Sequence, residues 1–295
     1  MPRRLLIASG LLVAMVAMSG CASAGSALPT PTAVATPLGD KTLNIVDLLE
    51  TAGDLSAFAP AQEAGTELAA REVNDAGGVL GGVVMIWHRA DDLPATLTEA
   101  AGAVKADAVI VAANPTAATS LLEVATTAKI ALLAIGTDKN IAEPTVKPYP
   151  DASAPAATAS AKPTAKATTS ASAEAPKPAE SAASSAAARK AGAPAVPTAE
   201  FITRLKSSNP FLTEFTYGAE SYQLVIALAL AATVANDDAG PSLIRGLEQV
   251  TTGDVVCTDF AECLTVLKDN RAIKYIGPAG RMAYDARVGV VTFGP

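Results

Sequence analysis

The sequence predicts an α/β fold built on a doubly wound parallel sheet. First, short apolar runs recur along the chain, and segments with helical periodicity separate them. Second, the turns between these segments are short, as they are in βαβ units. Third, the apolar runs do not alternate with polar residues, which is typical of parallel strands that helices cover on both faces.

The first block of predicted structure covers residues 42–147. Its strands are expected at 43–49, 83–87, 108–111 and 130–133, and its helices at 59–75, 94–105 and 120–128. Apolar residues at helical spacing fill the first helix, and Gly77-Gly78 can supply the left-handed residues that end it. Pro94 stands at a favoured position for the start of the second helix. This block therefore predicts four strands joined by three helices.

The second block covers residues 200–295. A short helix near Phe201 precedes a long helix over 219–235. The part from 224 to 235 is almost wholly apolar, but it is shorter than the roughly 20 residues of a membrane-spanning helix, so we expect a buried core helix. Further helices are expected at 241–250 and after Cys263, and two short strands at 282–285 and 288–292.

Residues 148–199, between the two blocks, are predicted to be a disordered linker. From Asp151 to Ala199 the chain consists mainly of Ala, Ser, Thr, Pro and Lys, without any aromatic residue, Leu or Ile. Such a composition cannot bury enough apolar surface to offset the entropy lost on ordering. We therefore expect a fold that this linker interrupts.

Residues 1–21 are predicted to be a lipoprotein signal peptide. Arg3 and Arg4 form a basic region, an apolar stretch follows over 5–18, and Ser19-Gly20 precede Cys21. This pattern matches the lipobox of bacterial lipoproteins, in which that cysteine becomes the acylated N-terminus. Two alternatives remain open: an ordinary signal peptide with a chance cysteine, and a single-span anchor.

Cys21 is therefore the predicted lipidation site. Residues 22–41 are expected to form a flexible tether, because the part from 22 to 37 is rich in Ala, Ser, Thr and Pro. The predicted location is the extracytoplasmic face of the cell membrane, and the membrane is a partner through the lipid anchor.

Cys257 and Cys263 are predicted to form a disulfide, because an oxidising compartment permits the pairing of the two cysteines that lipidation leaves. Two free thiols are the alternative. Their spacing is no zinc signature, since structural zinc sites need four ligands, and no metal site is expected.

Charge and motif content exclude several functions. Without Arg3 and Arg4 the chain carries 20 basic and 29 acidic residues, about −9, and an acidic surface argues against nucleic acid. No Gly-x-Ser-x-Gly elbow and no phosphate-binding Gly-x-x-x-x-Gly-Lys loop occurs. His88 is the single histidine and is expected to be a strand-edge residue. We therefore expect no enzyme, no catalytic residue and no cofactor.

Several motifs resemble type I periplasmic binding proteins, in particular the branched-chain amino-acid group of ABC transporters. The first block carries GTELA at 65–69 and EVNDAGGVLGG at 72–82, and the second carries YGA at 217–219, YIGPAG at 275–280 and YD at 284–285. The resemblance implies a periplasmic-binding-protein-like (type I) lobe. It also implies an extracytoplasmic solute-binding lipoprotein that binds a small polar solute such as an amino acid and has an ABC permease as partner.

The sequence departs from that family where the second lobe belongs. Family members insert this lobe after about the fourth strand, and here residues 148–199 occupy its place. We therefore interpret both blocks as parts of one lobe, and the protein as diverged from its family. The alternative function is a non-transport lipoprotein of the cell envelope that uses a single lobe as a scaffold or protein-interaction module.

The resemblance places the ligand-binding residues in the loops after the strands. Gly53 and Phe58 follow the first strand, Thr116 follows the third and Thr137 the fourth. Both threonines have an alternative role as helix-cap and turn residues.

Overall fold

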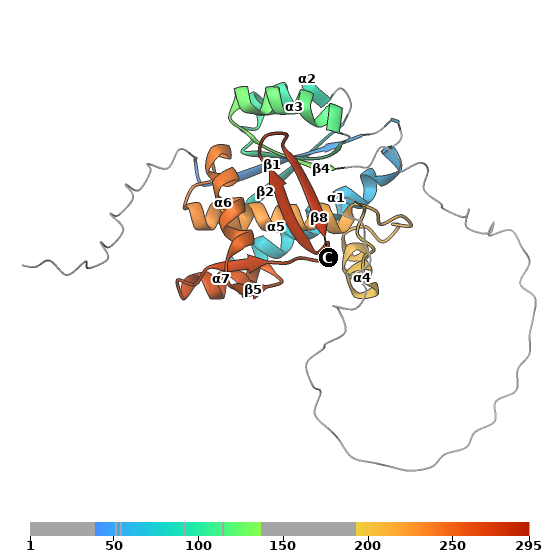
Figure 1. Ribbon diagram of the computed structural model, residues 1–295. Coiled ribbons are helices and arrows are strands. Elements are labelled where there is room, and N and C mark those ends of the chain that lie inside the picture. Colours follow the sequence, from blue (N-terminus) through green and yellow to red (C-terminus); the bar gives the residue numbers. More distant parts are fainter. Residues whose placement is uncertain are drawn as a thin grey trace, which may run out of the picture. The chain divides into compact units, whose positions relative to one another are not determined.

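A six-stranded sheet forms the centre of the computed structural model (Figure 1). The strand order is β2 (Val84–Ala90), β1 (Leu43–Leu49), β3 (Ala108–Ala113), β4 (Ala131–Gly136), β8 (Val290–Gly294) and β7 (Arg281–Asp285). All neighbouring strands are parallel except β7 and β8, which are antiparallel. The mostly parallel sheet confirms the predicted fold class.

The structure describes residues 39–50, 52–53, 55–90, 93–113, 115–136 and 193–294, and within the third helix it leaves the side chains of residues 115 and 116 undescribed. The signal peptide, Cys21, Thr137, most of the tether and most of the predicted linker lie outside these residues. Predictions about those segments remain predictions.

Helices cover both faces of the sheet. One face carries α2 (Leu93–Ala103) and α3 (Pro115–Ala128), which pack on Val46, Val109 and Leu132. The other face carries α1 (Ala59–Asp75), α5 (Gly218–Ala235) and α6 (Gly240–Thr252). These helices pack on the alternate residues of the same strands, whose side chains point to this face. Helices on both faces explain why β1, β3 and β4 are buried along almost their whole length, and the sheet is doubly wound as predicted.

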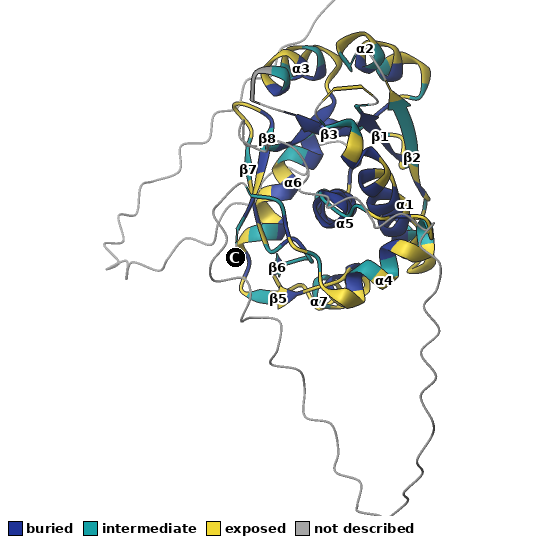
Figure 2. Cartoon of the chain, turned by 90° about the vertical axis from the view of Figure 1, so that its right-hand side faces the viewer, coloured by how far each residue is buried: buried dark blue, intermediate teal, exposed yellow. Residues whose placement is uncertain are grey.

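Helix α5 lies at the centre of the second layer, as its burial in Figure 2 shows. It has the length and hydropathy of a membrane span, but 83% of its residues are buried inside the protein. The prediction of a core helix is therefore confirmed.

A smaller layer lies beyond α5. It contains α4 (Ala199–Ser208), α7 (Phe260–Lys268) and a parallel pair of strands, β5 (Val255–Cys257) and β6 (Ile273–Tyr275). β5 and β6 were not predicted from the sequence, because three-residue strands are too short to show a period. Cys257 and Cys263 are disulfide-bonded, which is the pairing that the sequence favours.

Several predicted element boundaries need correction. The second strand extends to Ala90, the fourth extends to Gly136, the last is Val290–Gly294, and the third helix begins at Pro115 and not at Ser120. Proline is well placed in the first helical turn, where its missing N–H has no partner to lose, so this start could have been predicted.

The start of the second block also differs from the prediction. Ala195 is buried and its backbone N–H donates to the Glu220 carboxylate at 2.5 Å, while the Thr198 hydroxyl accepts from the Phe201 amide as the N-cap of α4. The described structure therefore includes residues 193–199, which belong to the predicted 148–199 linker. The composition of these residues gave no sign of this, because the contact with Glu220 is long-range.

The described parts of the two blocks share one sheet. Strand β8 of the second block pairs with β4 of the first, and both strands belong to one compact unit. A polar cluster also joins α1 to α4 and α5: Arg204 donates to both oxygens of the Glu72 carboxylate at 2.7 Å, and the Tyr222 hydroxyl donates to Glu72 at 2.6 Å.

Candidate functional site

The carboxyl edge of the sheet is the first candidate site. Strands β1, β3 and β4 are parallel, so their C-terminal ends meet at one edge. In open α/β sheets, ligands bind in the crevice outside this edge. The predicted binding residues belong to the segments that follow these three strands.

The structure describes two of the four predicted binding residues in full. Gly53 is exposed, with a φ of 95° that favours glycine, in the loop after β1. Phe58 is only 2% exposed, and its ring packs edge-on against Tyr217 with centroids 5.4 Å apart. Its packing in the core is a sufficient reason for an aromatic residue at this position.

The side chains of the two predicted threonines lie outside the described structure. Thr116 lies in the first turn of α3, but its side chain is outside the described atoms, as is all of Thr137. Their part in binding therefore stays a prediction.

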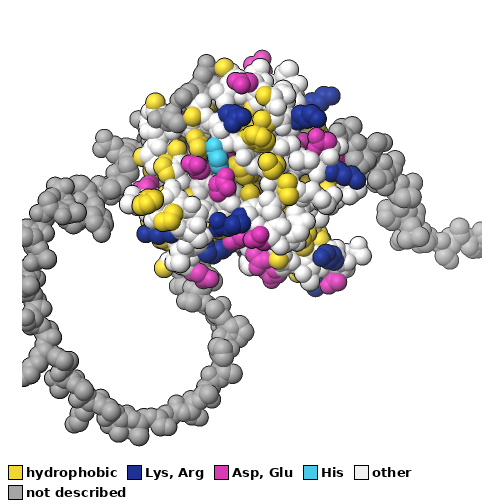
Figure 3. All heavy atoms as spheres, turned by 180° about the vertical axis from the view of Figure 1, so that it is seen from behind, with side chains coloured by type: hydrophobic (Ala, Val, Ile, Leu, Met, Phe, Trp, Pro, Cys, Tyr) yellow, Lys and Arg dark blue, Asp and Glu magenta, His cyan; other side chains and the backbone are white. Residues whose placement is uncertain are grey.

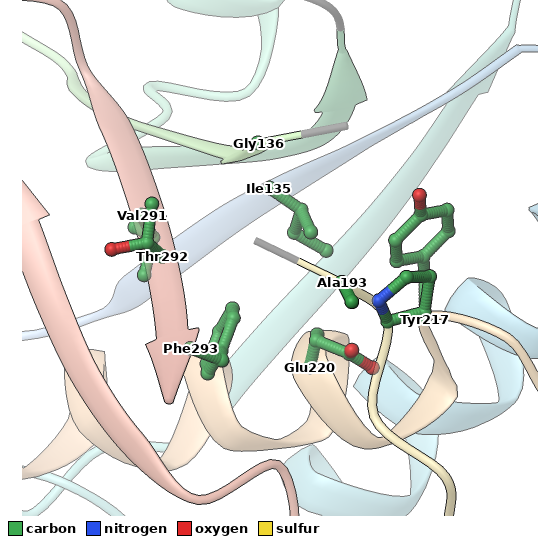
Figure 4. Close-up of a pocket in the computed structure, with 9 residues that line it drawn as sticks. Ile135, Gly136, Ala193, Tyr217, Glu220, Val291, Thr292 and Phe293 are labelled. Carbon is green, nitrogen blue, oxygen red and sulfur yellow. The ribbon is translucent and has the colours of Figure 1, made fainter. Parts of the chain in front are cut away.

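A small hollow lies at this edge between β4, β8 and the start of α5 (Figure 4). Ile135, Glu220 and Phe293 converge on it from these three elements, and Ala193-Pro194 close another side. Its volume is about 10 Å³, which is room for about one water molecule. Within the described residues, this hollow does not enclose an amino acid.

Glu220 explains why the hollow is small. Its carboxylate is 1% exposed and accepts the hydrogen bond from the Ala195 amide, which holds residues 193–195 against the edge. Glu220, Tyr217 and residues 193–194 were not predicted as site residues. Glu220 lies in the first turn of α5, before its apolar run, where an acidic residue is common, so the sequence carried no distinct signal for this site.

A second polar cluster surrounds His88, on the face that Figure 3 shows. His88 on β2 lies directly opposite Asp47 on β1, with Nδ1 at 3.2 Å from Asp47 Oδ2 and Nε2 at 2.8 Å from Glu67 Oε1. The Thr66 hydroxyl donates to the same Asp47 oxygen at 3.0 Å. Asp47 itself is fully buried. This cluster was not predicted, although an aspartate within an apolar strand was a visible signal.

The two carboxylates keep His88 charged. Burial alone would lower the pKa of His88, but hydrogen bonds to Asp47 and Glu67, together with the charges of Asp47 and Glu63, raise it to about 9. Protonated His88 thus forms ion pairs with one buried and one half-exposed carboxylate. Among the described residues no group of His, Cys, Asp or Glu could hold a metal ion. The arrangement is that of an ion-pair cluster that joins β1, β2 and α1.

The His88 cluster predicts a pH dependence of stability. The folded pKa lies above the unfolded value of 6.5, so the charged imidazole contributes fully below about pH 6.5, and the contribution is lost as the pH rises through about 9. Because the imidazole is partly exposed to screening solvent, we expect the free energy of unfolding to fall by about 1–2 kcal/mol across this window. Urea unfolding at a series of pH values measures it.

His88→Gln is the control for this pH dependence. Burial raises the pKa of Asp107 to about 7, so this residue titrates at the acid end of the same window, but in both proteins alike. The difference between wild type and variant isolates the histidine. Parallel pH profiles for the two proteins would contradict the ion-pair assignment.

Comparison with known proteins gives partial structural matches. No family model matches the chain, and no curated protein matches it. One similar solved structure is the branched-chain amino acid transporter substrate-binding protein LivJ from Streptococcus pneumoniae in complex with isoleucine. It has 26% identity and a TM-score of 0.31, and the match covers 34% of this chain and 30% of that one.

Two further matches are of the same kind. A solute-binding protein of an ABC transporter from R. palustris, in complex with 4-hydroxybenzoate, has 15% identity and a TM-score of 0.28 over 32% of this chain and 27% of that one. The leucine-binding protein LivK from Thermotoga maritima has 20% identity and a TM-score of 0.28 over 32% and 28%. The matched part is less than a third of the length of each of these proteins. Likenesses of this extent assign neither a family nor a ligand to the chain.

Proposed function

We propose that the chain is an extracytoplasmic lipoprotein, anchored through Cys21, whose α/β lobe is a diverged relative of the solute-binding proteins of ABC importers. The lipobox pattern supports the anchor, and the motif at residues 72–82 supports the relationship. The proposed ligands are branched-chain amino acids or similar small polar solutes, and the proposed partner is an ABC permease.

The observation that carries the solute-binding proposal is the carboxyl edge of the sheet. The edge is bordered by three segments. The loop with Gly53 follows β1, the first turn of α3 follows β3, and the N-terminus of α5 borders the hollow at the end of β4. The N-terminal turns of helices favour anionic groups such as the carboxylate of an amino acid. A solute would therefore bind at this edge.

A second function competes because the hollow at this edge is small. Ligand pockets commonly measure about 300–1,000 Å³ and bury most of their ligand, whereas this hollow measures about 10 Å³. The competing function is a lipoprotein of the cell envelope that uses the lobe as a scaffold or protein-interaction module and transports nothing.

Thermal unfolding with a set of solutes separates the two functions. A ligand at about 100 times its Kd stabilises a protein by about 2.7 kcal/mol, which raises the melting temperature measurably. We expect a branched-chain amino acid or another small polar solute to raise the melting temperature of the mature chain. Thr116→Ala should abolish this shift, and Thr127→Ala, a change of the same kind on an exposed site of the same helix, should preserve it. A cooperative transition that no solute moves would reject solute binding and favour the scaffold.

The anchor is tested by lipid labelling in a bacterial host. Cys21→Ser should abolish incorporation of a labelled fatty acid and release the protein from the membrane fraction, because neither Cys257 nor Cys263 is directly preceded by lipobox residues. The double variant Cys257→Ser, Cys263→Ser should still incorporate the label. Undiminished labelling of Cys21→Ser would disprove the anchor.

A further inference from the structure

A groove of ligand size lies away from the carboxyl edge. It runs between the C-terminal end of α5, α6, the end of α7 and β6, and its volume is about 540 Å³. That volume falls in the usual range of small-molecule sites. The hollow at the carboxyl edge is far smaller, so of the two only this groove has room for a small molecule.

The floor of the groove is apolar. Val234, Leu264 and Leu267 are partly buried side chains that pack on the main core, and Ile273 is buried beside them. Each of the three partly buried residues keeps apolar surface open to solvent. An apolar ligand group placed here would remove that surface from water, which is favourable.

The rim of the groove is cationic. Lys268 is the last residue of α7, Arg271 lies in the turn before β6, and both side chains are exposed. Neither side chain forms an ion pair or a side-chain hydrogen bond in the part of the chain that the structure describes. The chain as a whole has a net charge of −7. Two cations that form no ion pair among the described residues, beside an apolar floor, are therefore a local feature that favours an anion.

We propose that this groove binds a small amphiphilic carboxylate. The carboxylate lies between Lys268 and Arg271, and the hydrocarbon part covers Val234, Leu264 and Leu267. Arginine binds a carboxylate through paired N–H donors, and lysine adds a point charge. A neutral polar solute would leave the apolar floor exposed, and an inorganic anion would contact only the cationic rim. The groove therefore favours a molecule that has both a hydrocarbon part and a carboxylate.

The test uses decanoate, kept below its micelle-forming concentration, with the mature chain. We expect saturable binding of one decanoate per chain by isothermal titration calorimetry. Decanol, which lacks the charge, and acetate, which lacks the hydrocarbon, should each bind more weakly. The double variant Lys268→Gln, Arg271→Gln should bind decanoate at least about tenfold more weakly, a loss of about 1.4 kcal/mol, because both charged donors to the carboxylate are removed.

A matched control removes the same charges elsewhere. Lys105→Gln, Arg71→Gln should bind decanoate as the wild type does, which excludes a general effect of net charge. Thr116→Ala should also leave decanoate binding unchanged, so this site and the proposed solute site can fail separately. The proposal is overturned if decanoate does not bind, or if the Lys268→Gln, Arg271→Gln variant binds it as the wild type does. Binding to anionic phosphatidylglycerol vesicles without binding of monomeric decanoate would also overturn it, because the rim would then serve a lipid surface.

Discussion

Gly65→Ala is expected to lower the free energy of unfolding by about 2–3 kcal/mol, because the two blocks meet at this glycine. Gly65 lies on α1, where an added Cβ would collide with the Gly218 carbonyl oxygen of α5 and lie 3.1 Å from the Tyr222 amide nitrogen. Backbone atoms within helices cannot move aside as a flexible side chain can. Urea unfolding of the mature chain measures the loss.

Gly102→Ala is the matched control on α2. An added Cβ there meets nothing within 4 Å. Because alanine is the better helix former, we expect this variant to be more stable than the wild type by about 0.5–1 kcal/mol. Equal effects of the two substitutions would mean that α1 and α5 do not approach each other as closely as described.

Gln223→Leu is expected to lower the free energy of unfolding by about 2–4 kcal/mol. Gln223 is fully buried in α5, where its Nε2 donates to the Gly280 carbonyl at 2.7 Å and its Oε1 accepts from the Ala279 amide at 2.9 Å. Leucine keeps the volume but removes both hydrogen bonds to the turn before β7, and a buried polar group without its partner costs about 1–3 kcal/mol. Chemical unfolding again gives the difference.

Gln62→Leu separates hydrogen bonding from simple burial. Gln62 on α1 is buried as well, but its Oε1 has no hydrogen-bond partner among the described atoms. Its replacement by leucine is therefore expected to leave stability unchanged or to raise it. If Gln62→Leu destabilised the protein as much as Gln223→Leu, the hydrogen bonds of Gln223 would not be the cause.

The local elements could be predicted from the sequence, because local rules determine them. The bounds of α1 were predicted correctly from its periodic apolar residues and from Gly77-Gly78 at its end. Continuous apolar strands predicted the sheet with helices on both faces. Strands β5 and β6 escaped prediction because their stability comes from neighbouring elements and not from their own three residues.

The polar sites could not be predicted in the same way, because long-range register creates them. His88 meets Asp47 only because β1 and β2 pair in parallel at that register, and Glu67 joins them only because α1 packs over β1. The contact between Glu220 and Ala195 and the groove beside Lys268 likewise depend on how separate elements meet. Gly53 and Phe58 were placed correctly after β1, but the sequence did not indicate that the Phe58 ring is buried against Tyr217.

The pairing of β4 with β8 also determines when the sheet can be completed. Ala134 pairs with Val290, 156 residues later in the chain (290 − 134). Synthesis proceeds from the N-terminus, so β4 presents an unpaired edge until β8 has been made, and such an edge can pair with other chains. The entropic cost of closing so long a segment rises only logarithmically with its length. The segment must nevertheless close before the stabilising contacts between β4 and β8 can form. The chain length between the blocks therefore affects the folding rate and the exposure to aggregation far more than it affects the stability of the finished protein.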